Sequence, residues 1–382
     1  MRRADVIVIG AGVLGAFHAY FAARKGLKVL LLERNALPND ASVRNFGMIP
    51  RTIVGTEGPW AGFARASADL YRAIQREHDI SVSQRGSLYI GSTALENTVL
   101  QEFAQRFADR YNCLYIDKGD LLARYPFIRD AYARGGLHFP GDLGLDPRVM
   151  LRRLIPYLGA LGVEYAPETS ALAVEVAGHE CRVQTGRDTS FVAGHVFICS
   201  GADTATLFRE VLAESGLRVC KLQMMRTVPL PGVRLSPSIL SGLSIRRYPA
   251  FSSCPSYPLL QAEGVGEKLI AYGIHLLFKQ EADGSVVIGD SHHYAAPADA
   301  ATFQERTDCD VNDTILAYAR SMLRLPSWHM QTLWNGYYLV HDSEPIFTRT
   351  IDGRIHIATG IGGKGMATGP GFAQHSIATV FG

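Results

Sequence analysis

Apolar and polar residues at the start of the chain follow the pattern of one strand–helix–strand unit. Apolar runs predict strands over residues 5–9 and 28–32, and a helical pattern between them extends to about residue 25. Near the other end, a predicted strand at 355–358 leads through a glycine-rich turn into a final helix. The two ends therefore have the pattern of one α/β unit divided between distant segments.

The middle of the chain alternates between helical spacing and the shorter period of strands, with no internal repeat. The predicted helices span residues 60–78, 95–110, 147–161 and 311–324. The predicted strands span residues 87–91, 172–176, 181–185 and 195–199. Between 218 and 334, strand-like runs mix with proline-rich loops. We therefore expect a mixed α/β protein in which a second domain is inserted into the first.

Composition and charge exclude several classes of protein. The chain has 382 residues, enough for two or three domains, and its net charge of +2 disfavours binding to nucleic acid. The six cysteines form no Cys-x-x-Cys pair, so we expect neither a metal site nor a disulfide framework. The first strand leaves no room for a signal peptide, and no apolar run approaches the ~20 residues of a transmembrane segment. These features predict a cytoplasmic protein.

The strongest chemical signal is the motif GAGVLG, which follows the first predicted strand directly. Its residues are Gly10, Gly12, Val13, Leu14 and Gly15. The first glycine allows a tight turn, the second lets the backbone approach a pyrophosphate, and the third lets the helix pack closely on the sheet. Glu33 ends the second strand, where its carboxylate can accept hydrogen bonds from ribose hydroxyls. This combination predicts a dinucleotide site.

Two later segments favour a flavin over a nicotinamide dinucleotide. The run VFICSG at 196–201 is typical of a buried strand that ends in a small-residue turn and opens a helix. The run at 356–371 brings glycines 360, 362, 363, 365, 369 and 371 to the start of the last helix. A helix start needs a single cap residue, so close approach of a flat ligand explains six glycines better. We predict FAD, with a nicotinamide-dependent dehydrogenase as an alternative.

Several further motifs give the whole chain a resemblance to a known family. They are ASVRNFGMI at 41–49, LQMMRT at 222–227, LSIRRYPAF at 243–251, GDSHHY at 289–294 and GGKGMATGPG at 362–371. With the three glycine segments, they resemble the D-amino acid oxidase, glycine oxidase and sarcosine oxidase family of FAD-dependent amine oxidoreductases. Within that family the chain is most similar to a bacterial subgroup associated with aminophosphonate catabolism.

The resemblance implies a Rossmann-like FAD-binding domain built from residues 1–85, 140–217 and 330–382. An inserted antiparallel-sheet substrate domain would comprise residues 86–139 and 218–329. The implied cofactor-binding residues, besides those of GAGVLG, are Glu33, Arg34, Ser42, Arg44, Asn45, Phe46, Gly47, Met48, Val174, Ser200, Gly201, Gly360, Gly362, Gly363, Lys364, Gly365 and Met366. Val174 would lie near the adenine. Lys364, at the pyrimidine end of the flavin, would stabilise the negative charge of the reduced ring.

The substrate end of the predicted site departs from the pattern of many relatives. They carry a carboxylate-binding arginine after the tryptophan–glycine strand, where this chain has Tyr337 and Tyr338. We expect Lys364, Met48 and Tyr337 to be catalytic. The expected substrate-binding residues are Arg51, Arg246, Arg247, His275 and Tyr338.

The secondary structure around these residues adds three expectations. The double arginine is predicted on a strand, so that only one of the two side chains can enter the site. Lys268, His275 and Lys279 are predicted on the next strand. The pair His292 and His293 has no third ligand at a supporting spacing, so we expect no metal there.

The implied reaction is oxidative deamination of a small primary or secondary amine with an anionic head group. A hydride would pass to flavin N5, and the imine would then be hydrolysed by water. The favoured substrate is an aminophosphonate such as 2-aminoethylphosphonate or its N-methyl derivative, with oxygen or an electron carrier as acceptor. The alternatives are a glycine, sarcosine or D-amino acid oxidase or dehydrogenase in which Arg51 binds the carboxylate, and a non-catalytic flavin-binding subunit.

Overall fold

The computed structural model describes residues 2–186, 189–300 and 306–382. Its first sheet follows the order β18-β19-β11-β1-β2-β8, with β10 paired to β11 and β9 to β10. The strands are β1 (Arg2–Ile9), β2 (Val29–Leu32), β8 (Glu164–Ala166), β9 (Ala171–Ala177), β10 (Glu180–Thr185), β11 (Ser190–Ile198), β18 (Phe347–Ile351) and β19 (Ile355–Thr359). Strands β19, β11, β1, β2 and β8 are parallel to one another, whereas β18 pairs with β19 and β10 with β11 in antiparallel fashion. This parallel core explains the continuous apolar runs of its strands, which are buried on both faces.

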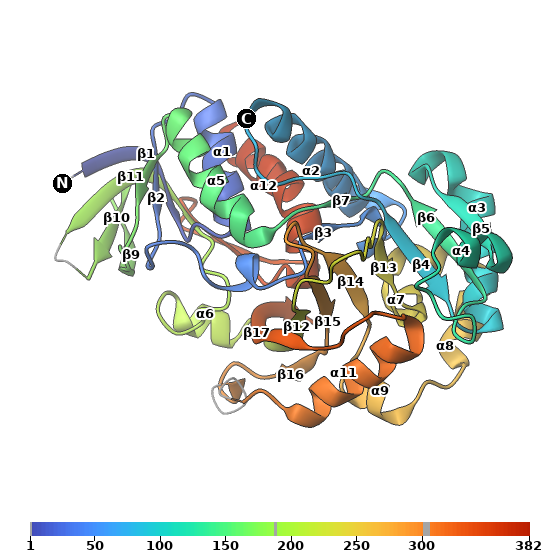
Figure 1. The fold of residues 1–382 in the computed structure, drawn as a ribbon. Helices are drawn as coiled ribbons and strands as arrows, with labels where there is room; N and C mark the ends of the chain where they lie inside the picture. Colours follow the sequence, from blue (N-terminus) through green and yellow to red (C-terminus); the bar gives the residue numbers. More distant parts are fainter. Residues whose placement is uncertain (1, 187–188, 301–305) are drawn as a thin grey trace.

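Four helices pack together beside the first sheet (Figure 1). They are α1 (Val13–Arg24), α2 (Gly58–Glu77), α5 (Pro147–Ala160) and α12 (Gly365–Phe381). Helix α12 packs against both α1 and α2, so the N-terminal and C-terminal segments lie side by side. Helix α5 begins with Asp146, whose side chain accepts hydrogen bonds from the amides of Arg148 and Val149. The predicted association of the two chain ends is confirmed.

The second sheet follows the order β16-β12-β15-β14-β13-β4-β6-β5, with β17 also paired to β12. Its strands are β4 (Ser87–Gly91), β5 (Leu114–Asp117), β6 (Gly135–Phe139), β12 (Leu217–Thr227), β13 (Ser238–Leu240), β14 (Leu277–Gln280), β15 (Val286–Gly289), β16 (His293–Ala295) and β17 (Met330–His341). All of its pairs are antiparallel except β13 with β4. The predicted fold class, a mixed α/β protein with a second, largely antiparallel sheet, is confirmed.

The other helices lie around this second sheet or in the segments that connect it to the first. The helices are α3 (Ala94–Tyr111), α4 (Lys118–Arg124), α6 (Arg209–Ala213), α7 (Gly242–Arg247), α8 (Tyr257–Ala262), α9 (Glu267–Ala271) and α11 (Cys309–Met322). A small antiparallel pair joins β3 (Met48–Ile49) to β7 (Leu143–Gly144) between the two sheets. No helix of the described residues is long and apolar enough to cross a membrane.

Three local expectations are wrong. Arg246 and Arg247 end helix α7 and are not on a strand, because Pro249 forces the preceding Tyr248 into an extended conformation that stops the helix. Lys268 lies in α9 and His275 in the loop before β14, so only Lys279 is on the expected strand.

The turn after β11 does not open a helix, since α6 begins only at Arg209. The predicted domain boundaries stay a prediction, although β17 pairs with the second sheet and not with the first.

Candidate active site

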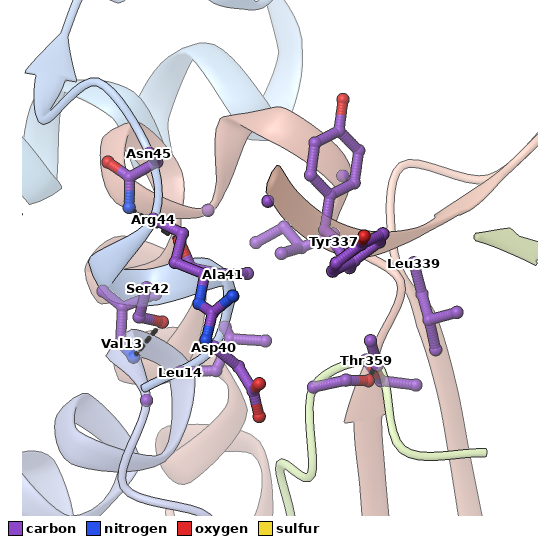
Figure 2. A pocket seen from close by; sticks show the side chains of 18 of the residues that line it. Val13, Leu14, Asp40, Ala41, Ser42, Arg44, Asn45, Tyr337, Leu339 and Thr359 are labelled. Atoms are coloured by element: carbon purple, nitrogen blue, oxygen red, sulfur yellow. Dashed lines mark hydrogen bonds between the residues drawn. The ribbon is translucent and has the colours of Figure 1, made fainter. Parts of the chain in front are cut away.

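A cavity of about 600 Å³ extends between the two sheets. Its walls come from the first turn of α1, the loop after β2, the turn after β11, the second sheet at β17 and α7, and the glycine turn before α12. Figure 2 shows the side chains of Asp40, Ser42 and Arg44 on one side of this space and those of Tyr337 and Leu339 on the other. A cavity of this size falls within the range of cofactor and ligand sites.

The glycine turn after β1 allows three backbone segments to meet. Gly10 has a φ of +96°, and a Cβ atom there would overlap the carbonyl oxygen of Cys199. Gly15 does not line the cavity: a Cβ atom on it would overlap the carbonyl oxygen of Gly10, so its role is to let helix and strand pack. Gly12 is the N-cap of α1 and has no side-chain cap. The start of α1 therefore faces the cavity with one of its amides, that of Val13, already bound by Ser42, and a helix N-terminus in this place suits a phosphate.

Glu33 lies at the end of β2, buried, and faces this turn. Its Oε2 accepts a hydrogen bond from the amide of Ala11 at 3.0 Å, and its Oε1 accepts one from the amide of Asn35 at 3.0 Å. A carboxylate oxygen can accept a second hydrogen bond, so Glu33 can still receive ribose hydroxyls. The neighbouring Arg34 donates hydrogen bonds to Asp40 and Asp203 across the cavity rim.

The loop after β2 is held by its own side chains. Ser42 Oγ accepts a hydrogen bond from the amide of Val13 at 2.9 Å (Figure 2). Asn45 donates to the carbonyl oxygen of Ala41 and accepts from the amide of Gly47, whose φ is +68°. Six residues of this loop predicted to bind the cofactor line the cavity: Ser42, Arg44, Asn45, Phe46, Gly47 and Met48. The loop is therefore braced by hydrogen bonds before any ligand binds.

The turn before α12 presents backbone and one cation to the cavity. Gly360, Gly362, Gly363, Lys364, Gly365 and Met366 all line it. Lys364 Nζ lies 5.5 Å from the ring centroid of Trp60, and burial lowers the pKa of Lys364 to about 8. A lysine with this pKa is partly protonated at neutral to mildly alkaline pH and can stabilise a negative charge that develops beside it.

Two glycines of the same run have a different role from the predicted one. Gly369 and Gly371 lie inside α12 and do not line the cavity. A Cβ atom on Gly371 would overlap the backbone of Phe63, and one on Gly369 would contact Leu14 and Val13. Close packing of α12 on α2 and α1 explains both glycines, so the cofactor interpretation of the whole run is corrected for these two.

The part of the cavity that is predicted to bind the adenine is lined by other residues than expected. Ser200 and Gly201 line it as predicted, but Val174 does not. The residues of that neighbourhood that do line it are Thr169, Ser170, Ala171 and Leu172, immediately before and at the start of β9. Val174 lies further along β9, beyond reach of the cavity.

The second-sheet wall contains Arg247, which α7 directs into the cavity. Its guanidinium donates a hydrogen bond to Tyr294 Oη at 3.2 Å. Tyr337 and Tyr338 also line the cavity from β17, and Tyr338 is paired with Cys220 of β12. Because arginine stays protonated at every physiological pH, this wall carries a permanent positive charge beside two phenol groups.

Two predicted anion-binding arginines lie elsewhere. Arg51 does not line the cavity: its guanidinium donates to the carbonyl oxygens of Arg110 at 3.3 Å and Tyr111 at 2.5 Å and stacks on the Tyr111 ring. Arg246 forms ion pairs with the buried Glu96 and the partly exposed Glu263. Both guanidinium groups are satisfied by structural partners, which corrects the expectation that they bind substrate.

The sequence did not reveal a cluster of titratable groups beside Arg247. His275, Asp290 and His292 are buried, line the cavity and bring one ligand atom each within 4.8 Å of one another. Burial raises the pKa of Asp290 to about 7 and holds the pKa values of both histidines well below their usual range. The expectation that His292 has no third ligand nearby is wrong, because the fold brings His275 and Asp290 to it. The spacing Asp-x-His was the available signal.

The geometry of the first-sheet wall fits FAD. The start of helix α1, a glycine turn without room for side chains, the Glu33 carboxylate and a second glycine turn with a lysine all line a single cavity. Gly10, Gly12, Glu33 and Ser200 would hold the ADP half, and Gly363, Lys364 and Met48 would lie along the flavin.

Comparisons with known proteins agree with this geometry. The family described as "DAO: FAD dependent oxidoreductase" matches residues 5–378. A glycine oxidase from Bacillus licheniformis is 23% identical over 349 residues, covering 88% of this chain and 81% of that protein.

Two solved structures share the fold. Glycine oxidase from Bacillus cereus has a TM-score of 0.78 at 18% identity, covering 99% of this chain and 94% of that one. L-α-glycerophosphate oxidase from Mycoplasma pneumoniae, with FAD bound, has a TM-score of 0.76 at 17% identity, covering 99% and 95%. The chain belongs to the DAO family of FAD-dependent oxidoreductases, enzymes of amine and amino acid oxidation.

Proposed function

We propose that this enzyme oxidises a small primary or secondary amine that carries an anionic head group, with an aminophosphonate as the favoured substrate. The named candidates are 2-aminoethylphosphonate and its N-methyl derivative. The observation that carries the proposal is Arg247, a cation on the second-sheet wall that lines the cavity beside Tyr294. A guanidinium with a neighbouring phenol suits a tetrahedral oxyanion, because both offer donors to oxygen atoms.

The rest of the substrate wall supports the same proposal. Where a carboxylate clamp is expected, β17 carries Tyr337 and Tyr338. The cations that line the cavity among the described residues are Arg34, Arg44, Lys364 and Arg247. Arg34 is paired with Asp40 and Asp203, and Arg44 donates to the carbonyl oxygen of Asn39 in the cofactor loop. Arg247 is therefore the cation placed to bind the head group of a substrate.

The chemistry needs an oxidant that accepts two electrons, and bound FAD supplies it. The amine carbon loses a hydrogen with its electron pair, the nitrogen loses a proton, and water hydrolyses the imine to a carbonyl compound and an amine or ammonia. Arg247 would fix the head group and so orient the carbon that reacts. Lys364 would stabilise negative charge that the reaction places at its end of the cavity. Oxygen or an electron carrier would then take up the electrons.

Steady-state kinetics with matched substrates test the proposal. 2-Aminoethylphosphonate and β-alanine share the CH2–CH2 linker between the amine and the head group and differ in the head group itself. Glycine, sarcosine and D-alanine complete the set. We expect the aminophosphonates to have the highest kcat/KM. Arg247→Ala removes the charge-assisted hydrogen bonds and should lower that kcat/KM about 100-fold, equivalent to about 3 kcal/mol.

Arg51→Ala is the matched control, because it removes a guanidinium that faces away from the cavity. Its kcat/KM should stay within about 2-fold of the wild-type value. If Arg51→Ala lowers kcat/KM and Arg247→Ala does not, the assignment of the head-group site is wrong.

A glycine, sarcosine or D-amino acid oxidase is the second candidate function. The glycine oxidase relative favours it, and Arg247 could bind a carboxylate with the same two donors. In that case glycine, sarcosine or D-alanine would exceed the aminophosphonates in kcat/KM, while Arg247→Ala would still be defective.

A further inference from the structure

His275, Asp290 and His292 are held in place by the backbone of the second sheet. The amide of Asp290 donates to the carbonyl oxygen of His275 at 3.1 Å, and the amide of His275 donates back at 3.3 Å. The amide of His292 donates to the carbonyl oxygen of Tyr272 at 2.9 Å. The exposed fractions of the three residues are only 6%, 9% and 6%. Backbone hydrogen bonds therefore fix the main chain that carries these three buried residues.

The hydrogen bonds at the outer ring nitrogens leave the inner ones free to coordinate. His292 Nδ1 lies 2.9 Å from the carbonyl oxygen of Gly273, which can only accept, so Nδ1 carries the proton and Nε2 keeps its lone pair. His275 Nδ1 is bound to Ser244 Oγ at 3.2 Å. Partners at the outer nitrogen are the usual way in which proteins orient metal-binding histidines.

The inner atoms face one another without a hydrogen bond among them. Asp290 Oδ1 lies 3.2 Å from His275 Nε2 but has no hydrogen-bond partner, and Asp290 Oδ2 lies 3.9 Å from His292 Nε2. The two imidazole rings stack with centroids 5.0 Å apart. A buried carboxylate oxygen without a donor is costly, and a cation between the three groups would satisfy all of them.

We propose that His275, Asp290 and His292 bind a divalent transition-metal ion of the Zn²⁺ class, with an open coordination position that faces the cavity. Two imidazoles and one carboxylate form a donor set used by catalytic zinc sites, which keep one position free for water or substrate. Mg²⁺ and Ca²⁺ prefer sites made of oxygen atoms, so a set with two nitrogen donors disfavours them.

The open position would bind the anionic head group of the substrate together with Arg247, a role that rests on the proposed function. The charges of the divalent ion, the Arg247 guanidinium and the Asp290 carboxylate sum to about +2. A phosphonate dianion neutralises this charge fully, whereas a carboxylate neutralises only half of it. Arg247 repels the ion when no anion is present. Binding of the ion and of the anion should therefore strengthen each other, and this coupling is reciprocal.

Metal titration of the FAD-loaded enzyme tests the site directly. After treatment with a chelator, equilibrium dialysis against Zn²⁺ should show one bound ion per chain. His275→Ala, His292→Ala and Asp290→Asn should each weaken this binding at least about 100-fold, whereas His293→Ala should not. His293 is the matched control because it neighbours His292 in sequence but its ring packs against Tyr272 instead. Retention of FAD identifies the variants that are folded.

The proposed site is wrong if the wild-type enzyme binds no Zn²⁺. It is also wrong if all folded triad variants bind Zn²⁺ as tightly as the wild type does. The coupling is tested with methylphosphonate and acetate, which lack an amine and cannot react. Methylphosphonate should tighten Zn²⁺ binding about 10-fold and acetate less, and Arg247→Ala should remove the difference. Equal affinity with and without methylphosphonate would overturn the head-group role.

The outcomes for metal and for substrate are separable. If the wild-type enzyme oxidises aminophosphonates at full rate without a bound ion, the proposed role of the metal in substrate binding is wrong and the proposed function is supported. If Zn²⁺ binds at His275, Asp290 and His292 and no aminophosphonate is oxidised, the metal site is supported and the proposed function is wrong.

Discussion

The two walls of the cavity are built in different ways. The first-sheet wall presents backbone through the turns at Gly10 and Gly360–Gly365. A Cβ atom would overlap the Cys199 carbonyl oxygen at Gly10 and the Leu217 side chain at Gly360. The second-sheet wall presents side chains, among them Arg247, His275 and Asp290, which come from separate elements. A wall made of backbone leaves a contiguous pattern of glycines in the sequence. A wall made of side chains exists only once the strands have paired.

Substitution of Gly10 should have the largest effect. Gly10 and Gly26 both have positive φ, of +96° and +79°, but a Cβ atom overlaps the Cys199 carbonyl oxygen at Gly10 and meets nothing within 4 Å at Gly26. Gly10→Ala should lower the free energy of unfolding by more than about 4 kcal/mol and abolish FAD binding, while Gly26→Ala should cost about 1 kcal/mol. Urea unfolding measures the loss of stability, and the yellow colour of the purified protein shows whether FAD is bound. Equal losses would show that the space at Gly10 does not matter.

Lys364 is a charged side chain on the first-sheet wall, and its charge should make stability depend on pH. Its pKa of about 8 in the folded protein lies below the usual 10.5, so between these values the unfolded chain binds more protons. The free energy of unfolding of FAD-free protein should therefore rise by up to about 3 kcal/mol from pH 8 to pH 10.5, relative to Lys364→Met. Urea unfolding of both proteins across this range measures the difference. A difference that stays constant with pH contradicts the burial of this lysine.

Substitutions at Gly371 and Gly363 distinguish helix packing from cofactor contact within the glycine-rich segment at 360–371. Gly371→Ala forces a Cβ atom against the Phe63 backbone and should lower the free energy of unfolding of FAD-free protein by about 2 kcal/mol. The folded variant should bind FAD as the wild type does. Gly363→Ala, whose Cβ atom has room 3.4 Å from Tyr338 Oη, should instead weaken FAD binding with little loss of stability. Fluorescence titration with FAD gives the affinities, and the reverse pattern would restore the cofactor role of Gly371.

The smallest effect is expected at the adenine end. Leu172 lines the cavity and Val174 does not, although both are on β9. Leu172→Ala should weaken FAD binding about 5-fold, equivalent to about 1 kcal/mol of apolar contact, whereas Val174→Ala should leave the affinity unchanged. The same titration measures both variants. A defect confined to Val174→Ala would mean that the strand faces the adenine differently.

The sequence predicted the parts of this fold that local patterns determine. Strand β1, helix α1 and Glu33 follow from apolar periodicity and glycine spacing, because each requirement lies within a few residues. Helix α7 was predicted as a strand, since six residues before a proline carry too few turns to show helical periodicity.

The arrangement of the second-sheet wall could not be predicted from the sequence, because its residues come together only through long-range contacts. Arg51 was favoured by its place near the flavin loop, but its partners are carbonyl oxygens of α3 almost sixty residues away. The cluster at His275 depends on the pairing of β14 with β15, which no local pattern specifies. Side-chain direction across a tertiary interface is the information that the sequence does not carry locally.

The central claim is that the second-sheet wall selects an amine with an anionic head group for oxidation by FAD. Anaerobic mixing of the yellow holoenzyme with 2-aminoethylphosphonate should bleach the visible flavin absorbance, and the same concentration of β-alanine should do so much more slowly. Arg247→Ala should lose most of this advantage at substrate concentrations below saturation. Bleaching by glycine, sarcosine or D-alanine but not by the aminophosphonates would contradict the account.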